Sequence, residues 1–459
     1  MELTNQNIAE YTRQFSYENI SDETVERTKK IVLDTLGVGI GAYTSPPSKA
    51  LRSTYQNTQS QTNGTIIGSS HKVSVEYAAL VNSALIRYLD YNDAYMTRRG
   101  GCHPSEHIGA LIAMAEVQNA SGEELIEAIV LAYELEGACT ETGLAWEHDS
   151  LDYVLWGAIS SVASVGKLMD LSYEELINAI GIAVTANAPL DIARHGDVQM
   201  WKGVAHGYVT HNAVQACQMA MNGLTGPGDV FKGPGGLNEH MNVDALEVGE
   251  LADDTSDEYR VMRTCIKPQI TAYMAQSPVE AALEIVNEHG IDASEITTIE
   301  IQSYREAIGI LADENKWGEN ITRETADHSM PYSVAAAIVD GELKKEQFKD
   351  HRINDPAIHR LMNLIEIEPN EKLAKYKDSY PTSTPSIVTI GTSSEKYTTR
   401  VNDPMGHPRK EMPEDFLLEK FEDLVGEYLS KQQQESIIQF CDHLDQKQSL
   451  TPLLTSLEI

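Results

Sequence analysis

The chain has 459 residues, and a chain of this length usually divides into two domains that each bury a core of their own. Its 69 acidic side chains outnumber its 35 basic ones, which gives a formal net charge of -34 at pH 7. A charge of this sign repels nucleic acid and anionic membrane surfaces, so we expect neither as a partner. A site for an anionic substrate would need a local concentration of Lys, Arg and His.

The N-terminus and the cysteines indicate the compartment. The first residues, MELTNQNIAEYTRQF, lack the basic and apolar regions of a secretory signal. No apolar run reaches the roughly 18 residues that cross a membrane, so we expect a cytoplasmic protein. The five cysteines are odd in number and widely scattered, which predicts reduced thiols. Without a C-x-x-C pair, the sequence gives no support for an iron–sulfur cluster.

The first part of the chain has a helical pattern. From residue 20 to about 226, apolar residues recur at three- and four-residue spacing, for example over 25–40 and 77–89. Ser172 followed by Glu175 is typical of a capping box at the start of a helix. These patterns predict an all-α first part.

The pattern changes after a Gly- and Pro-rich stretch, GLTGPGDVFKGPGG, which predicts a loop. TTIEIQSY, SIVTIGT and KYTTRV alternate as strands do, and the last two are spaced as a hairpin. Helical segments lie between them, and the chain is helical again beyond Pro413. The sequence therefore predicts a mainly α fold, in which residues 1–265 and 404–459 form a helical domain and residues 266–403 form an α+β domain.

A first candidate cluster lies in LDYNDAYMTRRGGCHPSEHIGALIAMAEV, where one helix ends near Asp90 and another begins after His103 and Pro104. Pro104 suits a first helical turn, so we expect His103 to be the N-cap. A helix N-terminus favours a carboxylate ligand, and Arg98 and Arg99 add positive charge to the same loop. The alternative is that Asp90 and Asp93 cap or solvate a loop and that His103 is a structural cap.

A second cluster, PLDIARHGDVQMWKGVAHGYVTHNA, contains Arg194, His195, Lys202, His206 and His211. We expect Lys202 to begin a helix and to bind a substrate carboxylate as a point charge. The alternative is a solvated helix start. The two later histidines are five residues apart, which does not suit a zinc-binding pair on one helix face, so we expect no metal site.

A third cluster, ADHSMPYSVAAAIVDG, places Asp327 and His328 before an apolar helix with Tyr332 in its first turn. The phenol could transfer a proton, or it could be a structural anchor with a hydrogen-bonded hydroxyl. Lys267 is a further candidate cation, and the sequence GHPR at 406–409 is a weaker candidate site.

These segments resemble, in order and spacing, the MmgE/PrpD family, which includes 2-methylcitrate dehydratase and cis-aconitate decarboxylase. The resemblance implies a helical domain formed by both chain ends, an inserted α+β lid and a homodimer. It is carried by VLDTLGVGIGAY at Val32, LDYNDAY at Leu89, HPS at His103, LDYVL at Leu151, WKG at Trp201, AQSPVEAAL at Ala275, DHSMPY at Asp327 and GHPR at Gly406.

The resemblance also implies which residues do the chemistry. Asp90 matches the family's active-site acid, His103 its HPS histidine, and Lys202 the lysine that follows tryptophan. Tyr332 matches the tyrosine of the DHxxxY motif, and Tyr153 stands where many members have a histidine. We expect Asp90 or His103 to be the base and Tyr332 or Tyr153 the acid.

The resemblance implies metal-independent dehydration of a small tricarboxylic hydroxy acid, in particular 2-methylcitrate, in propionate catabolism. We expect no cofactor, and carboxylate binding by Arg98, Arg194, Lys202, Lys267 and His328. Ala94 stands where decarboxylases have a threonine. The alternatives are decarboxylation of cis-aconitate, isomerisation or epimerisation of a similar acid, and a noncatalytic binding protein on the same scaffold.

Overall fold

The computed structural model describes residues 1–98, 100–147, 151–194, 198–252, 258–318 and 321–459. Two compact units divide the chain. The first, the helical unit, comprises Met1–Ile192, Gly203–Thr264 and Pro413–Ile459; the second, the α+β unit, comprises Ala193–Lys202 and Cys265–Met412. Helices dominate the described residues, which confirms the prediction of a mainly α fold.

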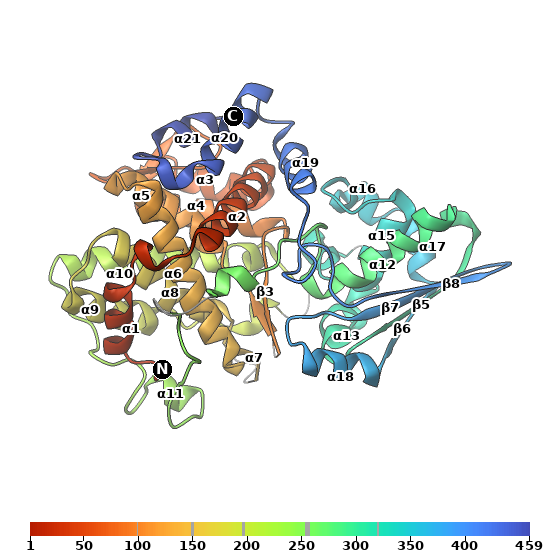
Figure 1. Ribbon diagram of the computed structural model, residues 1–459, viewed down its shortest axis with the longest axis horizontal. Helices are drawn as coiled ribbons and strands as arrows, with labels where there is room; N and C mark the ends of the chain where they lie inside the picture. Colours follow the sequence, from red (N-terminus) through yellow and green to blue (C-terminus); the bar gives the residue numbers. More distant parts are fainter. Residues whose placement is uncertain (99, 148–150, 195–197, 253–257, 319–320) are drawn as a thin grey trace. The chain divides into compact units, whose positions relative to one another are not determined.

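The helical unit is built around α4, α5, α6, α8 and α10, with α4 packed on α5 and α10, and α8 packed on α6 and α10. The C-terminal helices α19 and α20 pack on α2, so both chain ends complete this unit (Figure 1). Its helices are α1 (Asn5–Gln14), α2 (Asp22–Gly41), α3 (Pro46–Tyr55), α4 (Val75–Tyr88), α5 (Glu106–Gln118), α6 (Gly122–Glu141), α7 (Leu144–Glu147), α8 (Val154–Leu168), α9 (Tyr173–Ala186), α10 (Ala205–Met221), α11 (Leu237–His240), α19 (Glu414–Val425), α20 (Lys431–Asp442) and α21 (Thr451–Ser456).

Glycines bring the central helices into close contact. A Cβ atom added to Gly109 of α5 would lie 2.6 Å from the backbone of Asn82 in α4. One added to Gly207 of α10 would lie 2.6 Å from the carbonyl oxygen of Leu80, also in α4. Because side chains at these positions would push the helices apart, α4 is held closely between two neighbours.

The expectation of an all-α first part is wrong in one respect. The unit contains two antiparallel hairpins, β1 (Asn63–Thr65) with β2 (Lys72–Ser74) and β3 (Tyr95–Thr97) with β4 (Gly100–Cys102). Each strand has three residues, which is too short for an alternating pattern to be recognised. The capping box of Ser172 and Glu175 at the start of α9 is confirmed.

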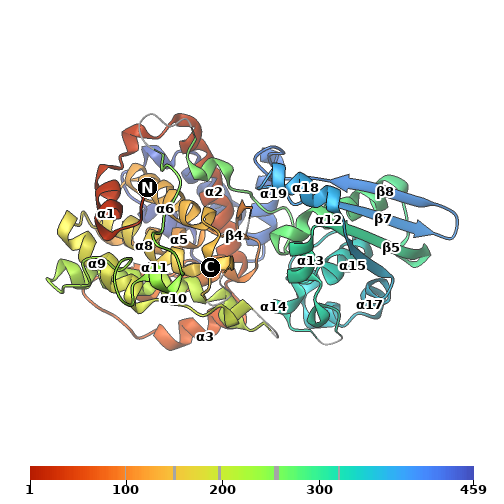
Figure 2. The same ribbon diagram turned by 90° about the horizontal axis from the view of Figure 1, so that it is seen from below.

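The α+β unit contains a four-stranded sheet in the order β6-β5-β7-β8. β5 (Ile296–Ser303) pairs antiparallel with β7 (Ser386–Thr392), which forms the predicted hairpin with β8 (Lys396–Val401). Figure 2 shows these three strands side by side. The edge strand β6 (Ile365–Pro369) runs parallel to β5 and was not predicted, because its polar sequence IEIEP buries little more than Ile365.

Short helices complete the α+β unit, and α12 packs on β7, β8 and α15. They are α12 (Tyr273–His289), α13 (Arg305–Leu311), α14 (Arg323–Ala326), α15 (Met330–Asp340), α16 (Asp350–Ile353), α17 (Pro356–Met362) and α18 (Glu371–Ser379). The segment Ala193–Lys202 belongs to this unit, although it precedes α10 of the helical unit in the chain. No change in the composition of the sequence indicates this assignment. Among the described residues, no helix is long and apolar enough to cross a membrane. The five cysteines are free thiols, as predicted.

Candidate active site

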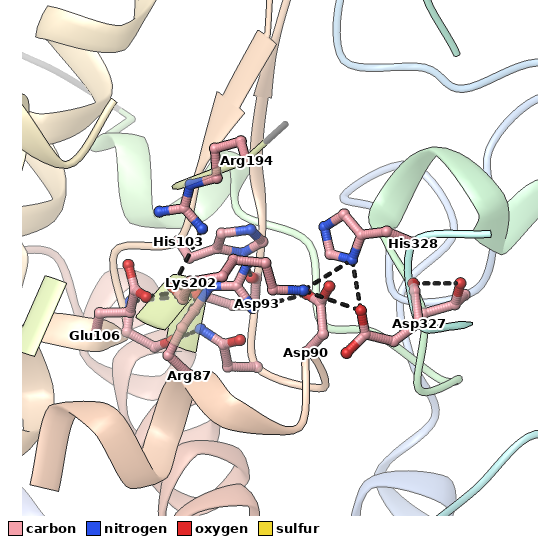
Figure 3. Close-up of polar contacts among 12 residues, drawn as sticks. Arg87, Asp90, Asp93, His103, Glu106, Arg194, Lys202, Asp327 and His328 are labelled. Atoms are coloured by element: carbon pink, nitrogen blue, oxygen red, sulfur yellow. Dashed lines mark hydrogen bonds and ion pairs between the residues drawn. The ribbon is translucent and has the colours of Figure 1, made fainter. Parts of the chain in front are cut away.

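Asp90 follows the C-terminal end of α4 and has a left-handed backbone conformation, with φ +54°. Asp tolerates this conformation better than most residues, and it turns the side chain back toward the helix. Oδ1 of Asp90 accepts a hydrogen bond from Nη1 of Arg87 at 3.0 Å, and both side chains are buried (Figure 3). The helix end and this ion pair together fix the carboxylate.

Asp93 organises the loop that follows. Its Oδ1 accepts hydrogen bonds from the backbone N–H and the hydroxyl of Ser105, at 3.2 and 2.6 Å, and its Oδ2 accepts one from the Tyr133 hydroxyl at 2.7 Å. Burial raises the pKa of Asp93 to about 6, although these hydrogen bonds oppose the shift. With both oxygens occupied, Asp93 is an anchor of the loop.

His103 is held in one tautomer. Its Nδ1 lies 2.6 Å from the carbonyl oxygen of Asp93. A carbonyl can only accept a hydrogen bond, so Nδ1 carries the proton and the neutral ring has its lone pair on Nε2. The expectation that His103 caps α5 is wrong, because the N-cap residue is Ser105 and the helix begins at Glu106. The helix-cap role is therefore excluded, and proton transfer stays the candidate role of His103.

Arg87 and Glu106 connect Asp90 to Tyr153. Nε of Arg87 lies 3.2 Å from Oε1 of Glu106, and the Tyr153 hydroxyl lies 3.4 Å from Oε2 of the same carboxylate. The rings of Tyr153 and His103 meet edge to face, with centroids 6.0 Å apart. The helical unit thus brings together three of the four catalytic residues predicted from the sequence, namely Asp90, His103 and Tyr153.

Behind this group lies a triad that could hold a metal ion, His107, Glu136 and His206. Ligand atoms from all three lie within 4.8 Å of one another, and the residues are buried. His107 is already engaged, since its Nδ1 lies 2.9 Å from the Ser161 hydroxyl and its Nε2 lies 3.1 Å from Glu136. A metal ion would have to replace the contact between His107 and Glu136.

The α+β unit holds a second cluster around the buried carboxylate of Asp327 (Figure 3). Lys202 and Arg323 each lie 2.9 Å from it, and Nδ1 of His328 lies at 2.6 Å. Nζ of Lys202 also lies 2.9 Å from Nδ1 of His328. Burial disfavours the charged form, but Lys202, His328 and Arg323 together lower the pKa of Asp327 to about 2. Two basic side chains, Lys202 and Arg323, thus share one carboxylate.

The residues predicted to bind substrate carboxylates differ in their environments. Nη1 of Arg194 donates to the carbonyl oxygen of Lys202 at 3.2 Å, so it supports the backbone of this segment. Lys202 lies in a 3₁₀ turn, Met200–Gly203, and does not begin a helix as predicted. Lys267 is fully buried, whereas Arg98 is exposed in the turn between β3 and β4. Arg99 and His195 lie outside the described residues.

Tyr332 has the environment of a structural anchor. It is fully buried, its hydroxyl donates to the carbonyl oxygen of Gln347, and its ring packs on Phe348. Burial raises its pKa above the usual range. These contacts favour the structural alternative for Tyr332, which the sequence left open.

The GHPR sequence forms a turn. Nδ1 of His407 accepts a hydrogen bond from the backbone N–H of Arg409 at 3.0 Å, and Arg409 forms an ion pair with Asp403. Burial lowers the pKa of His407 to about 4. A neutral histidine that accepts a backbone hydrogen bond explains this sequence without a catalytic role.

Three charged residues of these clusters were not predicted. Arg87 precedes Asp90 by three residues, and Arg323 precedes Asp327 by four, which are the spacings of side chains on one helix face. Glu106 directly follows HPS in the sequence. Looking for basic residues one turn before each candidate acid would have identified both arginines.

Comparison with known proteins assigns the family. Residues 6–245 match the MmgE/PrpD N-terminal domain, and residues 271–446 match the MmgE/PrpD C-terminal domain. Together these matches cover most of the chain, which therefore belongs to the MmgE/PrpD family.

Similar proteins extend over nearly the whole length. A protein of Cupriavidus necator named 2-methylcitrate dehydratase is 26% identical over 451 residues, covering 92% of this chain and 90% of its own. A protein of Escherichia coli K12 that is also named 2-methylcitrate dehydratase is 26% identical, covering 91% of this chain and 90% of its own. Human cis-aconitate decarboxylase is 23% identical over 463 residues, covering 96% of this chain and 91% of its own.

Proposed function

We propose that the chain is a hydro-lyase that dehydrates a small tricarboxylic hydroxy acid, with 2-methylcitrate as its substrate and propionate catabolism as its context. The observation that supports this most is the full-length similarity to proteins named 2-methylcitrate dehydratase. The helical unit holds candidate acid–base groups, and the α+β unit holds a candidate lysine for binding a carboxylate.

Removal of the C–H proton next to a carboxylate requires a base. Asp90 and His103 are the candidates, because each is fixed by a specific contact, to Arg87 and to the carbonyl oxygen of Asp93 respectively. The fixed tautomer places the lone pair of neutral His103 on Nε2, as a base requires. The electron pair released by the C–H bond forms the new double bond.

Departure of the hydroxyl requires a proton donor, so that water leaves. We assign this role to Tyr153, whose hydroxyl lies 3.4 Å from Glu106 and whose ring lies beside His103. Tyr332 is the weaker candidate, since its hydroxyl donates to a backbone carbonyl.

Lys202 is assigned to substrate carboxylate binding, with His328 beside it. A Lys ammonium is a compact positive charge with N–H donors, which suits a carboxylate ligand, and the contacts with Asp327 and His328 fix its position. Arg323 pairs with the same Asp327 carboxylate and so offsets part of its negative charge.

Decarboxylation of cis-aconitate is the second candidate, because human cis-aconitate decarboxylase covers the chain to the same extent. Both reactions start from a small polycarboxylate, and their products distinguish them. Only decarboxylation releases carbon dioxide.

The test is an assay of the purified protein on 2-methylcitrate, citrate and cis-aconitate, with and without a chelator. We expect 2-methylcitrate to give the strongest increase in ultraviolet absorbance from the new double bond, and the chelator to leave the rate unchanged. Asp90→Asn should remove the activity, because the amide keeps the shape but can neither accept a proton nor balance the charge of Arg87. Activity that requires added iron, or an active Asp90→Asn enzyme, would contradict the proposal.

A further inference from the structure

Arg87 connects three elements of the helical unit. It lies in the last turn of α4 and is 2% exposed. Its Nη1 contacts Asp90 after α4, and its Nε contacts Glu106, the first residue of α5. Tyr153, the N-cap residue of α8, also interacts with the guanidinium and with Glu106. One side chain therefore joins the ends of α4, α5 and α8.

The geometry of the guanidinium matters here. Its Nη1 donates a hydrogen bond to Asp90, whereas its Nε lies 3.2 Å from Oε1 of Glu106 in an ion pair without hydrogen-bond geometry. The guanidinium therefore holds the first carboxylate by a directed bond and the second by charge. Burial opposes the charged form, but Asp90, Tyr153 and Glu106 raise the pKa of Arg87 above its usual value. The group therefore stays charged and cannot take part in proton transfer itself. A Lys at this position would keep the charge, but its single nitrogen could not contact Asp90 and Glu106 from two separate nitrogens of one rigid group.

We propose that Arg87 is the positioning residue of this active site, which holds the base Asp90 directly and the acid Tyr153 through Glu106 in one fixed arrangement. This inference rests on the proposed function, in which Asp90 is one of the two candidate bases and Tyr153 donates a proton. Arg87 acts through these two groups, so its loss affects the chemical step more than substrate binding.

The same unit offers a matched control in Arg260. This arginine is also buried, and its ion pairs are with Glu134 and Glu141 on α6. Replacing it with Lys likewise removes a buried guanidinium that contacts two carboxylates, so the variant controls for the loss of such a group. Any difference in kinetics between the two variants then reports on Asp90 and Tyr153.

The experiment compares Arg87→Lys with Arg260→Lys. In Arg87→Lys we expect kcat to fall about a hundredfold, the scale for misplaced reacting groups, while KM changes only a few-fold. In Arg260→Lys the melting temperature should fall but kcat should stay within a few-fold of the original enzyme. Equal kinetic losses in both variants, or a nearly normal kcat in Arg87→Lys, would overturn the proposal. If Arg87→Lys does not fold, Glu106→Gln removes the link to Tyr153, and the same loss of kcat is expected.

A second readout separates this inference from the proposed function. With 3-fluorotyrosine incorporated at position 153, the fluorine resonance should shift in Arg87→Lys and stay in place in Arg260→Lys. If the original enzyme turns over none of the acids, the proposed function fails, and this resonance still decides the role of Arg87. An unchanged resonance in Arg87→Lys would overturn the positioning role.

Discussion

For His103, the structure excludes one of the two roles considered from the sequence, that of a helix cap. Ser105 occupies the N-cap position of α5, so replacing His103 removes no helix cap. We expect His103→Asn to keep its melting temperature and to lose about a hundredfold in kcat, the usual scale for a positioned acid–base group. Steady-state kinetics and thermal unfolding measure both. His211→Asn is the control, since His211 is a buried histidine of α10 that packs on Tyr77. A stable His103→Asn enzyme with normal kcat would remove His103 from the mechanism.

We predict that Lys202 contributes to substrate binding and therefore affects KM. In Lys202→Met the expected result is a rise in KM of about 10- to 100-fold, because a charge-assisted hydrogen bond contributes about 1.5–3 kcal/mol. The change in kcat should be smaller. Lys420→Met is the matched control, because Lys420 is also buried and paired with one acid, Asp34, in the helical unit. An unchanged KM in the Lys202 variant, or an equal rise in the control, would exclude carboxylate binding by Lys202.

The two tyrosines predicted to donate a proton are now distinguished. Tyr153→Phe should lower kcat, because Tyr153 lies beside Glu106 and His103. Tyr332→Phe should leave kcat unchanged and reduce the free energy of unfolding by about 1–3 kcal/mol, since the carbonyl oxygen of Gln347 loses its buried donor. Chemical denaturation and initial rates on both variants test this assignment. The opposite pattern of kcat losses would restore Tyr332 as the acid.

At the scale of elements, the Asp93 carboxylate anchors the loop between α4 and α5 through hydrogen bonds with Ser105 and Tyr133. Burial raises its pKa from 3.8 to about 6, so the folded protein binds this proton more tightly than the unfolded chain does. Stability from this group is therefore complete below about pH 4 and is lost as the pH rises through 6, by about 3 kcal/mol in total.

Asp93→Asn removes this titration, because an amide does not ionise. As the pH rises from 4 to 7, the original protein should lose stability relative to the variant, which denaturant titrations at several pH values can measure. Parallel pH profiles for the two proteins would show that Asp93 keeps an ordinary pKa.

Long elements could be predicted from the sequence, and short ones could not. α9, β5 and the β7–β8 hairpin follow directly from capping and alternation. The three-residue strands β3 and β4, the polar edge strand β6 and the 3₁₀ turn of Lys202 give too little pattern. For the same reason His103 was predicted as a cap: Pro104 suggested the first turn, but the helix begins two residues later, at Glu106.

Candidate site residues were predictable where a motif contains them. Asp90, His103 and Tyr153 share one cluster, whereas Tyr332 lies in a motif and still has a structural environment. Arg87 and Glu106 were missed because their importance depends on three-dimensional contacts between helix ends. A linear motif does not record such contacts.

For the whole molecule, the net charge of -34 makes the location of positive charge informative. The buried Lys202 and the partly exposed Arg323 pair with Asp327 in the α+β unit, and the buried Arg87 lies among acids in the helical unit. A strongly acidic protein that keeps such clusters is suited to bind a small anion at one place and to repel polyanions elsewhere.

The most direct test of the account is a competition between 2-methylcitrate and cis-aconitate, supplied together at equal concentration to the purified protein. Mass spectrometry of the mixture follows both acids and their products over time. The account predicts that 2-methylcitrate loses water and that no carbon dioxide is released from cis-aconitate. Consumption of cis-aconitate with release of carbon dioxide, while 2-methylcitrate persists, would contradict it.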